Sequence, residues 1–184
     1  MTVTRTIRLE AELDEALEKL ASDGGESVNA LLNRTLRKLA EWDRVAEAFG
    51  IMGVAQGTLI RLMEAITQDQ ARELGVWAAR EQWEPMMRYM YGQVSVDSVL
   101  RSIDLLARNS SRFIFDHVVM GRKHVITIRH SMGMKWSSFY EGAARTTIED
   151  LLGLKCVTQL TGETVDVEFQ TQDKKEGAHL GELN

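Results

Sequence analysis

The chain has 184 residues, of which 44% are hydrophobic and 27% charged, and its formal net charge is −5. This balance is typical of a folded chain of one or two domains and argues against a protein that coats nucleic acid by bulk charge. No stretch approaches the roughly 20 apolar residues of a membrane span, and the amino terminus lacks a signal-peptide pattern. We therefore expect a cytoplasmic protein with no membrane partner. Cys156 is the only cysteine, which excludes an intrachain disulfide.

The first 48 residues predict a short strand and two helices. Residues 2–9 alternate β-branched or apolar side chains with polar ones, a pattern that predicts a strand. A helix is expected from about residue 11 to residue 22, with a stop at Gly24-Gly25, and Ser27 is the expected N-cap of a second helix. These elements are too few to enclose a core of their own, so we expect residues 1–48 to dimerise.

An α+β domain is expected over residues 67–170, after a connecting segment over residues 49–66 that contains three glycines. Thr67 and Gln70 have capping-box spacing, and the helix that they open is expected to end before Pro85. Further on, the sequence predicts a helix over residues 96–107, a hairpin over residues 112–130 with its turn at Gly121-Arg122, a helix over residues 136–152 and a second hairpin over residues 154–169. The polar tail, residues 171–184, is expected to be frayed.

The N-terminal pattern carries a family resemblance. A polar-faced strand, a helix that ends in glycines and a second helix that opens with Gly-Glu-Ser-Val-Asn-Ala-Leu-Leu-Asn resemble the ribbon-helix-helix family of Arc, MetJ and CopG. The resemblance covers about the first quarter of the chain. It implies a β-α-α fold in which two chains intertwine and pair their strands into an antiparallel ribbon that enters the DNA major groove. The expected fold class is therefore a ribbon-helix-helix module followed by an α+β domain with an antiparallel sheet.

The same resemblance implies which residues contact DNA. The outward positions of the ribbon are Thr4, Thr6 and Arg8, whose hydroxyl, methyl and guanidinium groups suit base edges. Arg5 has the opposite parity and is expected to contact a phosphate. A second phosphate contact is implied at the amides that open the second helix, at Ser27, Val28 and Asn29.

The function implied is that of a prokaryotic-type, sequence-specific transcription regulator such as a repressor, a homodimer or a tetramer of paired dimers on double-stranded DNA. The C-terminal domain is then expected to bind a small-molecule or metal effector or to extend the oligomer. One alternative is an antitoxin-like dimer that holds a protein partner, because residues 1–44 carry nine acidic against seven basic side chains.

A second alternative is a metal- or haem-binding sensor. The turn at Gly121-Arg122 places His117, His124 and His130 on one face of the first hairpin, and His117 and His124 should be diagonal neighbours. Nickel-responsive ribbon-helix-helix regulators also place a metal-sensing domain after such a module. The sequence shows no obvious third ligand beside the pair, so ordinary structural histidines are the favoured interpretation.

The remaining motifs assign neither an effector nor a cofactor. Residues 130–169 resemble small-molecule-sensing domains of the vinyl-reductase type, which often carry two cysteines on the last hairpin, whereas this chain has only Cys156. Met and aromatic residues between Trp77 and Tyr91 can line an apolar pocket, although a core role is more usual. Ser137, Ser138 and the histidines show no nucleophile–base pattern, so we expect no enzymatic activity.

Overall fold

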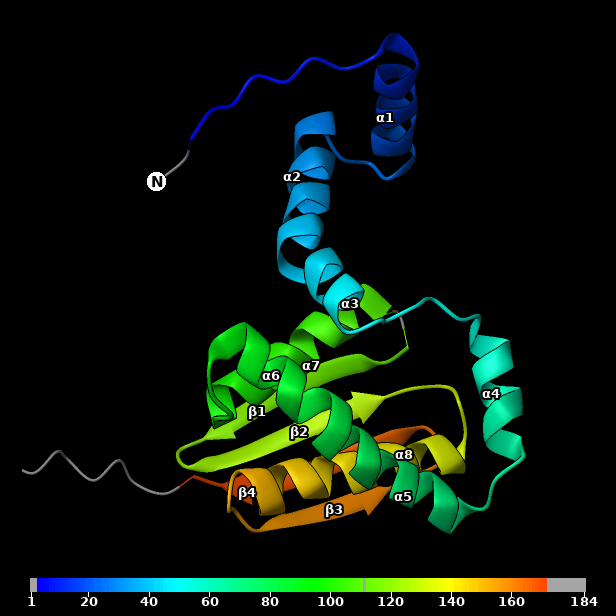
Figure 1. Ribbon diagram of the computed structural model, residues 1–184, viewed down its shortest axis with the longest axis vertical. Helices are drawn as coiled ribbons and strands as arrows, with labels where there is room; N and C mark the ends of the chain where they lie inside the picture. Colours follow the sequence, from blue (N-terminus) through cyan, green and yellow to red (C-terminus); the bar gives the residue numbers. More distant parts are fainter. Residues whose placement is uncertain (1–2, 111, 172–184) are drawn as a thin grey trace, which may run out of the picture. The chain divides into compact units, whose positions relative to one another are not determined.

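The computed structural model describes residues 3–110 and 112–171 of the chain (Figure 1). The chain divides into two compact units, Met1–Gly50 and Ile51–Asn184, and each is described by itself. Among the residues described, no helix is long and apolar enough to cross a membrane. Residue 2 of the expected strand, and the expected tail from residue 172 onward, lie outside the described residues.

Helices make up most of the first unit. Its elements are α1 (Ala11–Asp23), α2 (Val28–Lys38), the π-helical turn η1 (Leu39–Asp43) and α3 (Arg44–Ala48). Gly25 turns the chain after α1 with a positive φ of 65°, a conformation that favours glycine. Ser27 begins α2 as its N-cap, because its hydroxyl accepts a hydrogen bond from the backbone N–H of Ala30 at 3.2 Å. This cap was predicted from the sequence.

The predicted N-terminal strand is absent, and the ribbon-helix-helix fold class is contradicted. Residues 3–10 form no strand, and the first regular element is the helix that begins at Ala11. A strand needs a neighbour to accept and donate its ladder hydrogen bonds, and within residues 3–110 and 112–171 nothing pairs with this segment. The strand prediction was wrong because alternation of β-branched and polar residues favours an extended backbone but does not supply a partner strand.

The second unit combines helices with one antiparallel sheet. Its helical elements are α4 (Gln56–Glu64), α5 (Gln68–Ala78), η2 (Ala79–Trp83), α6 (Glu84–Tyr91), α7 (Val96–Ser110), α8 (Met134–Arg145) and η3 (Thr146–Leu151). Its strands are β1 (Ile114–Met120), β2 (Lys123–Arg129), β3 (Cys156–Leu160) and β4 (Thr164–Gln170). The strand order is β1-β2-β4-β3. The first hairpin turns at Gly121-Arg122 as predicted, with Met120 paired to Lys123 and a positive φ of 63° at Gly121.

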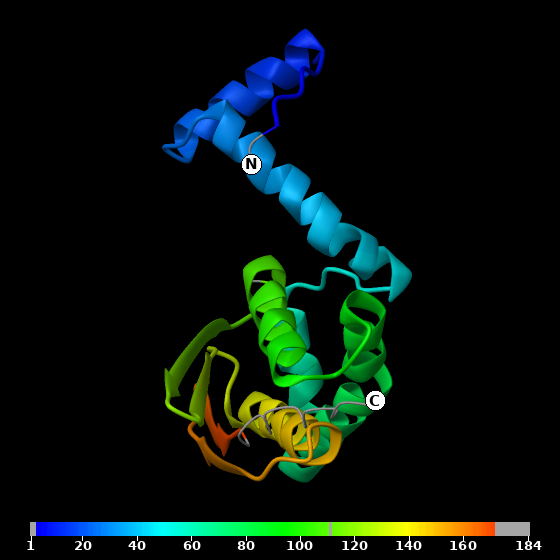
Figure 2. The ribbon, with the colours of Figure 1, turned by 90° about the vertical axis from the view of Figure 1, so that its left-hand side faces the viewer.

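The helices of this unit lie on one side of the sheet, and no other described element of the unit covers the opposite face (Figure 2). Alternate side chains of β2 and β4 point into the core that the helices cover. There they pack against Trp136, Tyr140 and Ile148 of α8 and η3. Met63 of α4 is buried in the same core, so the segment expected as a connector contributes to the packing of the second unit.

Candidate functional sites

The residues expected to read DNA bases lie together at the start of the chain. Thr4, Thr6 and Arg8 are all exposed on the extended segment that leads into α1. Arg5 is exposed on the same segment. Without strand pairing the segment has no fixed inward and outward faces. The structure therefore gives no reason why Arg5 should contact a phosphate while the other three residues contact bases.

The expected phosphate site is the start of α2. The N–H groups of Val28 and Asn29 are in the first turn, where helix geometry offers no backbone acceptor, and the helix dipole is positive there. Ser27 and Asn29 are exposed and Val28 is half-buried. The neighbouring carboxylate of Glu26 opposes an anion, but Arg34 holds it in an ion pair of 2.6 Å.

The first unit leaves much of its apolar surface uncovered. The buried apolar residues of α1 and α2 are Ala21 and Leu31. Large side chains that are about half exposed or more are Val3 (64%), Ile7 (54%), Leu13 (49%), Leu20 (59%), Leu36 (55%) and Leu39 (52%). An apolar surface of this kind on a small unit is typical of a protein interface.

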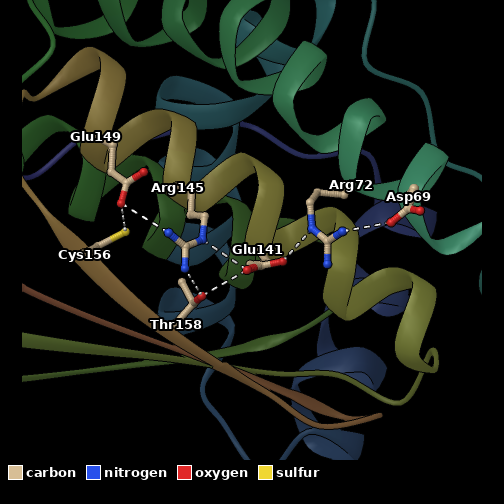
Figure 3. A network of polar contacts seen from close by, with 7 residues as sticks. All are labelled: Asp69, Arg72, Glu141, Arg145, Glu149, Cys156 and Thr158. Carbon is tan, nitrogen blue, oxygen red and sulfur yellow. Dashed lines mark hydrogen bonds and ion pairs between the residues drawn. The ribbon is translucent and has the colours of Figure 1, made fainter.

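A polar network joins α5, α8, η3 and β3 in the second unit (Figure 3). Glu141 of α8 is at its centre, with a side chain only 9% exposed. One carboxylate oxygen accepts from Nε of Arg72 at 2.8 Å, and the other accepts from Nε of Arg145 at 3.1 Å and from the hydroxyl of Thr158 at 3.0 Å. Asp69 and Glu149 extend the network at its two ends.

The electrostatics of this network are those of a satisfied structural cluster. Burial alone would raise the pKa of Glu141, but the hydrogen bonds from Arg72, Arg145 and Thr158 outweigh it, and the pKa is lowered. Glu141 is therefore ionised at neutral pH, and its charge is compensated by the two arginines. A general acid would need the opposite shift, so the cluster is not suited to proton transfer near neutral pH.

His117 and His124 come together as the register predicts. His117 is opposite Ile126 across the β1–β2 ladder, and Nε2 of His117 lies 3.0 Å from Nδ1 of His124. The two rings lie between Phe115 and Phe169 in a row of nearly parallel rings. Burial, and then the proximity of His124, lower the pKa of His117.

His130 does not join that pair. It is buried, and its Nδ1 accepts a hydrogen bond from the N–H of Met132, so that Nε2 carries the proton and donates to Ser137 at 3.1 Å. Ser137 in turn donates to the carbonyl oxygen of Thr161 at 2.6 Å. A histidine and a serine are thus in contact, which the sequence did not suggest. Because the imidazole is the donor, however, it is not arranged as a base toward the hydroxyl.

The other candidates remain separate. Across the described ranges, no group of three or more His, Cys, Asp or Glu side chains is arranged to hold a metal ion. Cys156 is half-buried beside Glu149, and burial raises the pKa of its thiol to about 11. Between Trp77 and Tyr91, Met86 and Met87 are core residues, whereas Trp77 and Tyr89 are 49% and 62% exposed.

The Glu141 network was not predicted from the sequence. The available signal was a carboxylate within the run Ser-Ser-Phe-Tyr-Glu-Gly-Ala-Ala, where apolar or small residues surround a charge that needs a partner. That partner, Arg72, is distant in sequence. Comparison with known proteins adds no assignment: no protein-family model matches the chain, and no match was found among curated proteins.

Proposed function

We propose that the chain is a homodimeric DNA-binding transcription regulator. The observation that supports this most is the first segment, on which Thr4, Thr6 and Arg8 are exposed immediately before α1. An arginine and two threonines offer the donors, acceptors and methyl groups that base edges recognise. In this proposal the segment acts as an extended arm, anchored by α1, that inserts its side chains into a DNA groove.

Dimerisation follows from the apolar surface of the first unit. Leu13 and Leu20 of α1 and Leu36 of α2 are half exposed in the single chain. Pairing with the same surface of a second chain removes the exposed half of each side chain from water, which contributes up to about half of the roughly 1.5–3 kcal/mol of a fully buried leucine. A two-fold pair then presents two arms to DNA, and two-fold symmetry predicts a palindromic site.

The start of α2 supplies the positioning contact in this proposal. The first-turn amides at Val28 and Asn29 and the positive helix end can bind a phosphate oxygen. A contact of this kind is independent of base sequence and fixes the protein on the duplex. The acidic residues of α1 oppose non-specific binding, so we expect affinity to depend on these local contacts and not on the net charge of −5.

The second unit is proposed to be an effector or oligomerisation domain. Its core is well covered by helices, and the buried Glu141 network ties α5 to α8 and β3. A rigid body of this kind can transmit a binding event to a DNA-binding unit or hold two copies together.

Binding of the full chain to duplex DNA from its own promoter region tests the proposal. We expect Arg8→Ala to weaken the specific complex by roughly 1–3 kcal/mol, a loss of about 5-fold to 150-fold, and to leave the dimer intact. The matched control is Arg61→Ala, since Arg61 of α4 is also exposed, at 85%, and forms a local ion pair with Glu64 three residues away. Equal affinities of the Arg8→Ala and Arg61→Ala variants would contradict the role of the arm.

A further inference from the structure

Strand β1 is an open edge of the sheet with an apolar surface. It pairs with β2 on one side, and within residues 3–110 and 112–171 no strand pairs with its other side. More than half of each of four side chains is exposed. These are Ile114 (62%), Val118 (55%) and Met120 (55%) on the open face of the sheet, and Val119 (51%) on the face that the helices cover. An unpaired edge of this composition is a template for another strand.

Apart from Val125 and Val157, the rest of the open sheet face is polar, and four of its side chains satisfy one another in two pairs. Lys123 forms an ion pair with Glu168 at 2.7 Å, and Thr127 donates to Asp166 at 2.6 Å. Such pairs satisfy their own charges and need no outside partner. The apolar side chains on this face that are more than half exposed are Ile114, Val118 and Met120 of β1 and Val157 of β3, so three of the four lie along the β1 edge.

The usual protections of an edge strand are missing from β1. The strand has no proline or lysine, and its register with β2 runs without a bulge from Ile114 to Met120. Its one carboxylate, Asp116, forms an ion pair with Arg129 of β2, so its charge is neutralised and does not repel an added strand.

We propose that β1 pairs antiparallel with β1 of a second copy of this chain, which joins the two sheets into one. The proposal deepens the proposed function, on whose homodimer it rests: a pair held at the first units raises the effective concentration of the second units and strengthens the β1 contact, which also forms without that pair as protein concentration rises. An isologous contact of this kind uses the same surface twice, so one apolar strand supplies both sides.

The sequence of β1 is compatible with pairing to itself in full overlap. When the two strands are centred on His117, Ile114 of one copy is opposite Met120 of the other, and Phe115 is opposite Val119. Asp116 is then opposite Val118, so no like charges meet, whereas a register that places Asp116 opposite its own copy is disfavoured. The two His117 residues are opposite each other at the centre, and in the single chain burial and the proximity of His124 already lower the pKa of His117, which disfavours a like-charge contact there.

Sedimentation velocity of full-length variants tests this edge separately from the first unit. Leu20→Lys with Leu36→Lys places charges on the apolar surface of α1 and α2 and removes that contribution to assembly. We expect this double variant still to form a dimer as concentration rises. Adding Val118→Lys should leave a monomer at every concentration, since a charge on an edge strand blocks pairing.

The matched control adds Val157→Lys instead. Val157 is 63% exposed on β3, the opposite edge of the same sheet, and we expect that variant to keep the dimer. A monomeric Leu20→Lys/Leu36→Lys protein would overturn the β1 contact, as would equal effects of Val118→Lys and Val157→Lys. Circular dichroism identifies any variant that has unfolded. If a variant has unfolded, hydrogen exchange of the wild-type protein replaces the comparison. The β1 contact then requires that the β1 amides exchange more slowly as protein concentration rises.

Failure of the proposed function gives a different result. If wild type and the Leu20→Lys/Leu36→Lys protein assemble equally well, the first units do not pair. The Val118→Lys comparison still reports on β1 in that case.

Discussion

Gly75 in α5 lies directly against the backbone carbonyl oxygen of Phe139 in α8, where an added Cβ would be only 2.0 Å from that oxygen. The contact is reciprocal, because a Cβ on Gly142 of α8 would be 2.3 Å from the carbonyl oxygen of Arg72 in α5. The two helices thus cross backbone to backbone, which brings the guanidinium of Arg72 within reach of Glu141. The glycines and the ion pair belong to one helix crossing.

Substitution of Gly75 should separate the two helices. A methyl group at 2.0 Å from a backbone oxygen forces α5 and α8 apart, and we expect Gly75→Ala to lower the free energy of unfolding by about 3 kcal/mol or more. Gly57→Ala is the control, since Gly57 in α4 has no atom within 4 Å of an added Cβ. That change should be neutral or stabilising by up to about 1 kcal/mol. Equal stabilities of the two variants in urea denaturation would refute the backbone crossing.

Removal of the charge of Glu141 should leave two arginines without their shared partner. We expect Glu141→Gln to lower the free energy of unfolding by about 2 kcal/mol, less than for a fully buried pair, because Arg72 and Arg145 are 39% and 41% exposed. Asp97→Asn is the control: it removes the acid of an exposed i,i+4 pair with Arg101, and we expect a change within about 0.5 kcal/mol. Urea denaturation of both variants measures the difference, and similar losses would argue against a special role for the buried carboxylate.

The Glu141 network should also shape stability in acid. The pKa of Glu141 is below its ordinary value of 4.5 in the folded chain, against the effect of burial, because of the hydrogen bonds from Arg72, Arg145 and Thr158. Its contribution is therefore present above 4.5 and is lost as the pH falls toward the folded pKa. We expect wild type to lose stability more steeply than Glu141→Gln in this range, measured by thermal denaturation. Parallel pH profiles would contradict this assignment.

Burial of His130 predicts a second loss of stability in mild acid. Burial lowers the pKa of His130 below its ordinary value of 6.5, although Glu163 opposes the shift. The unfolded chain therefore takes up a proton first, and stability falls as the pH drops below 6.5. Protonated Nδ1 would also face the N–H of Met132. We expect His130→Gln to flatten the slope of melting temperature against pH in part, since His117 shifts in the same direction. An unchanged slope in His130→Gln would count against this.

Cys156 should be an unreactive thiol. Burial raises the pKa of Cys156 to about 11, and the carboxylate of Glu149, 3.5 Å from the sulfur, acts in the same direction. At about pH 8 the thiolate fraction is then roughly 100-fold smaller than at the ordinary value of 9.0. We expect slow alkylation by iodoacetamide in the folded protein and fast alkylation in urea, with Glu149→Gln several-fold faster than wild type. Rapid labelling of the native chain would show that the thiol is activated.

Local signals in the sequence predicted several local structures. The capping box of Thr67 and Gln70 is present, with both of its hydrogen bonds. The Gly121-Arg122 turn set the register that brings His117 to His124. Helix capping and turn formation depend on residues that are close together in the chain, so the sequence alone is enough to predict them.

Most features that were missed or wrong depend on distant partners, and the end predicted before Pro85 is the local exception. The N-terminal strand failed because no second strand pairs with it. Pro85 did not end the helical run, because α6 begins at Glu84 and places the proline in its first turn, where no backbone N–H is needed. The close approach of α5 and α8 at Gly75 and Gly142, and the ion pair between Arg72 and Glu141, join residues that are far apart in the sequence. The periodicity of each helix does not show which glycine of one helix faces which carbonyl group of the other.

Selection of DNA from a randomised duplex library by the full chain tests the central proposal most directly. At near-physiological salt of about 0.15 M, we expect enrichment of one palindromic motif, because a two-fold pair of chains presents two identical arms carrying Arg8. The Arg8→Ala variant should enrich the motif weakly or relax it at one position in each half-site. Enrichment of no motif by the wild-type chain would contradict sequence-specific DNA binding, and an enriched motif without two-fold symmetry would contradict the homodimer.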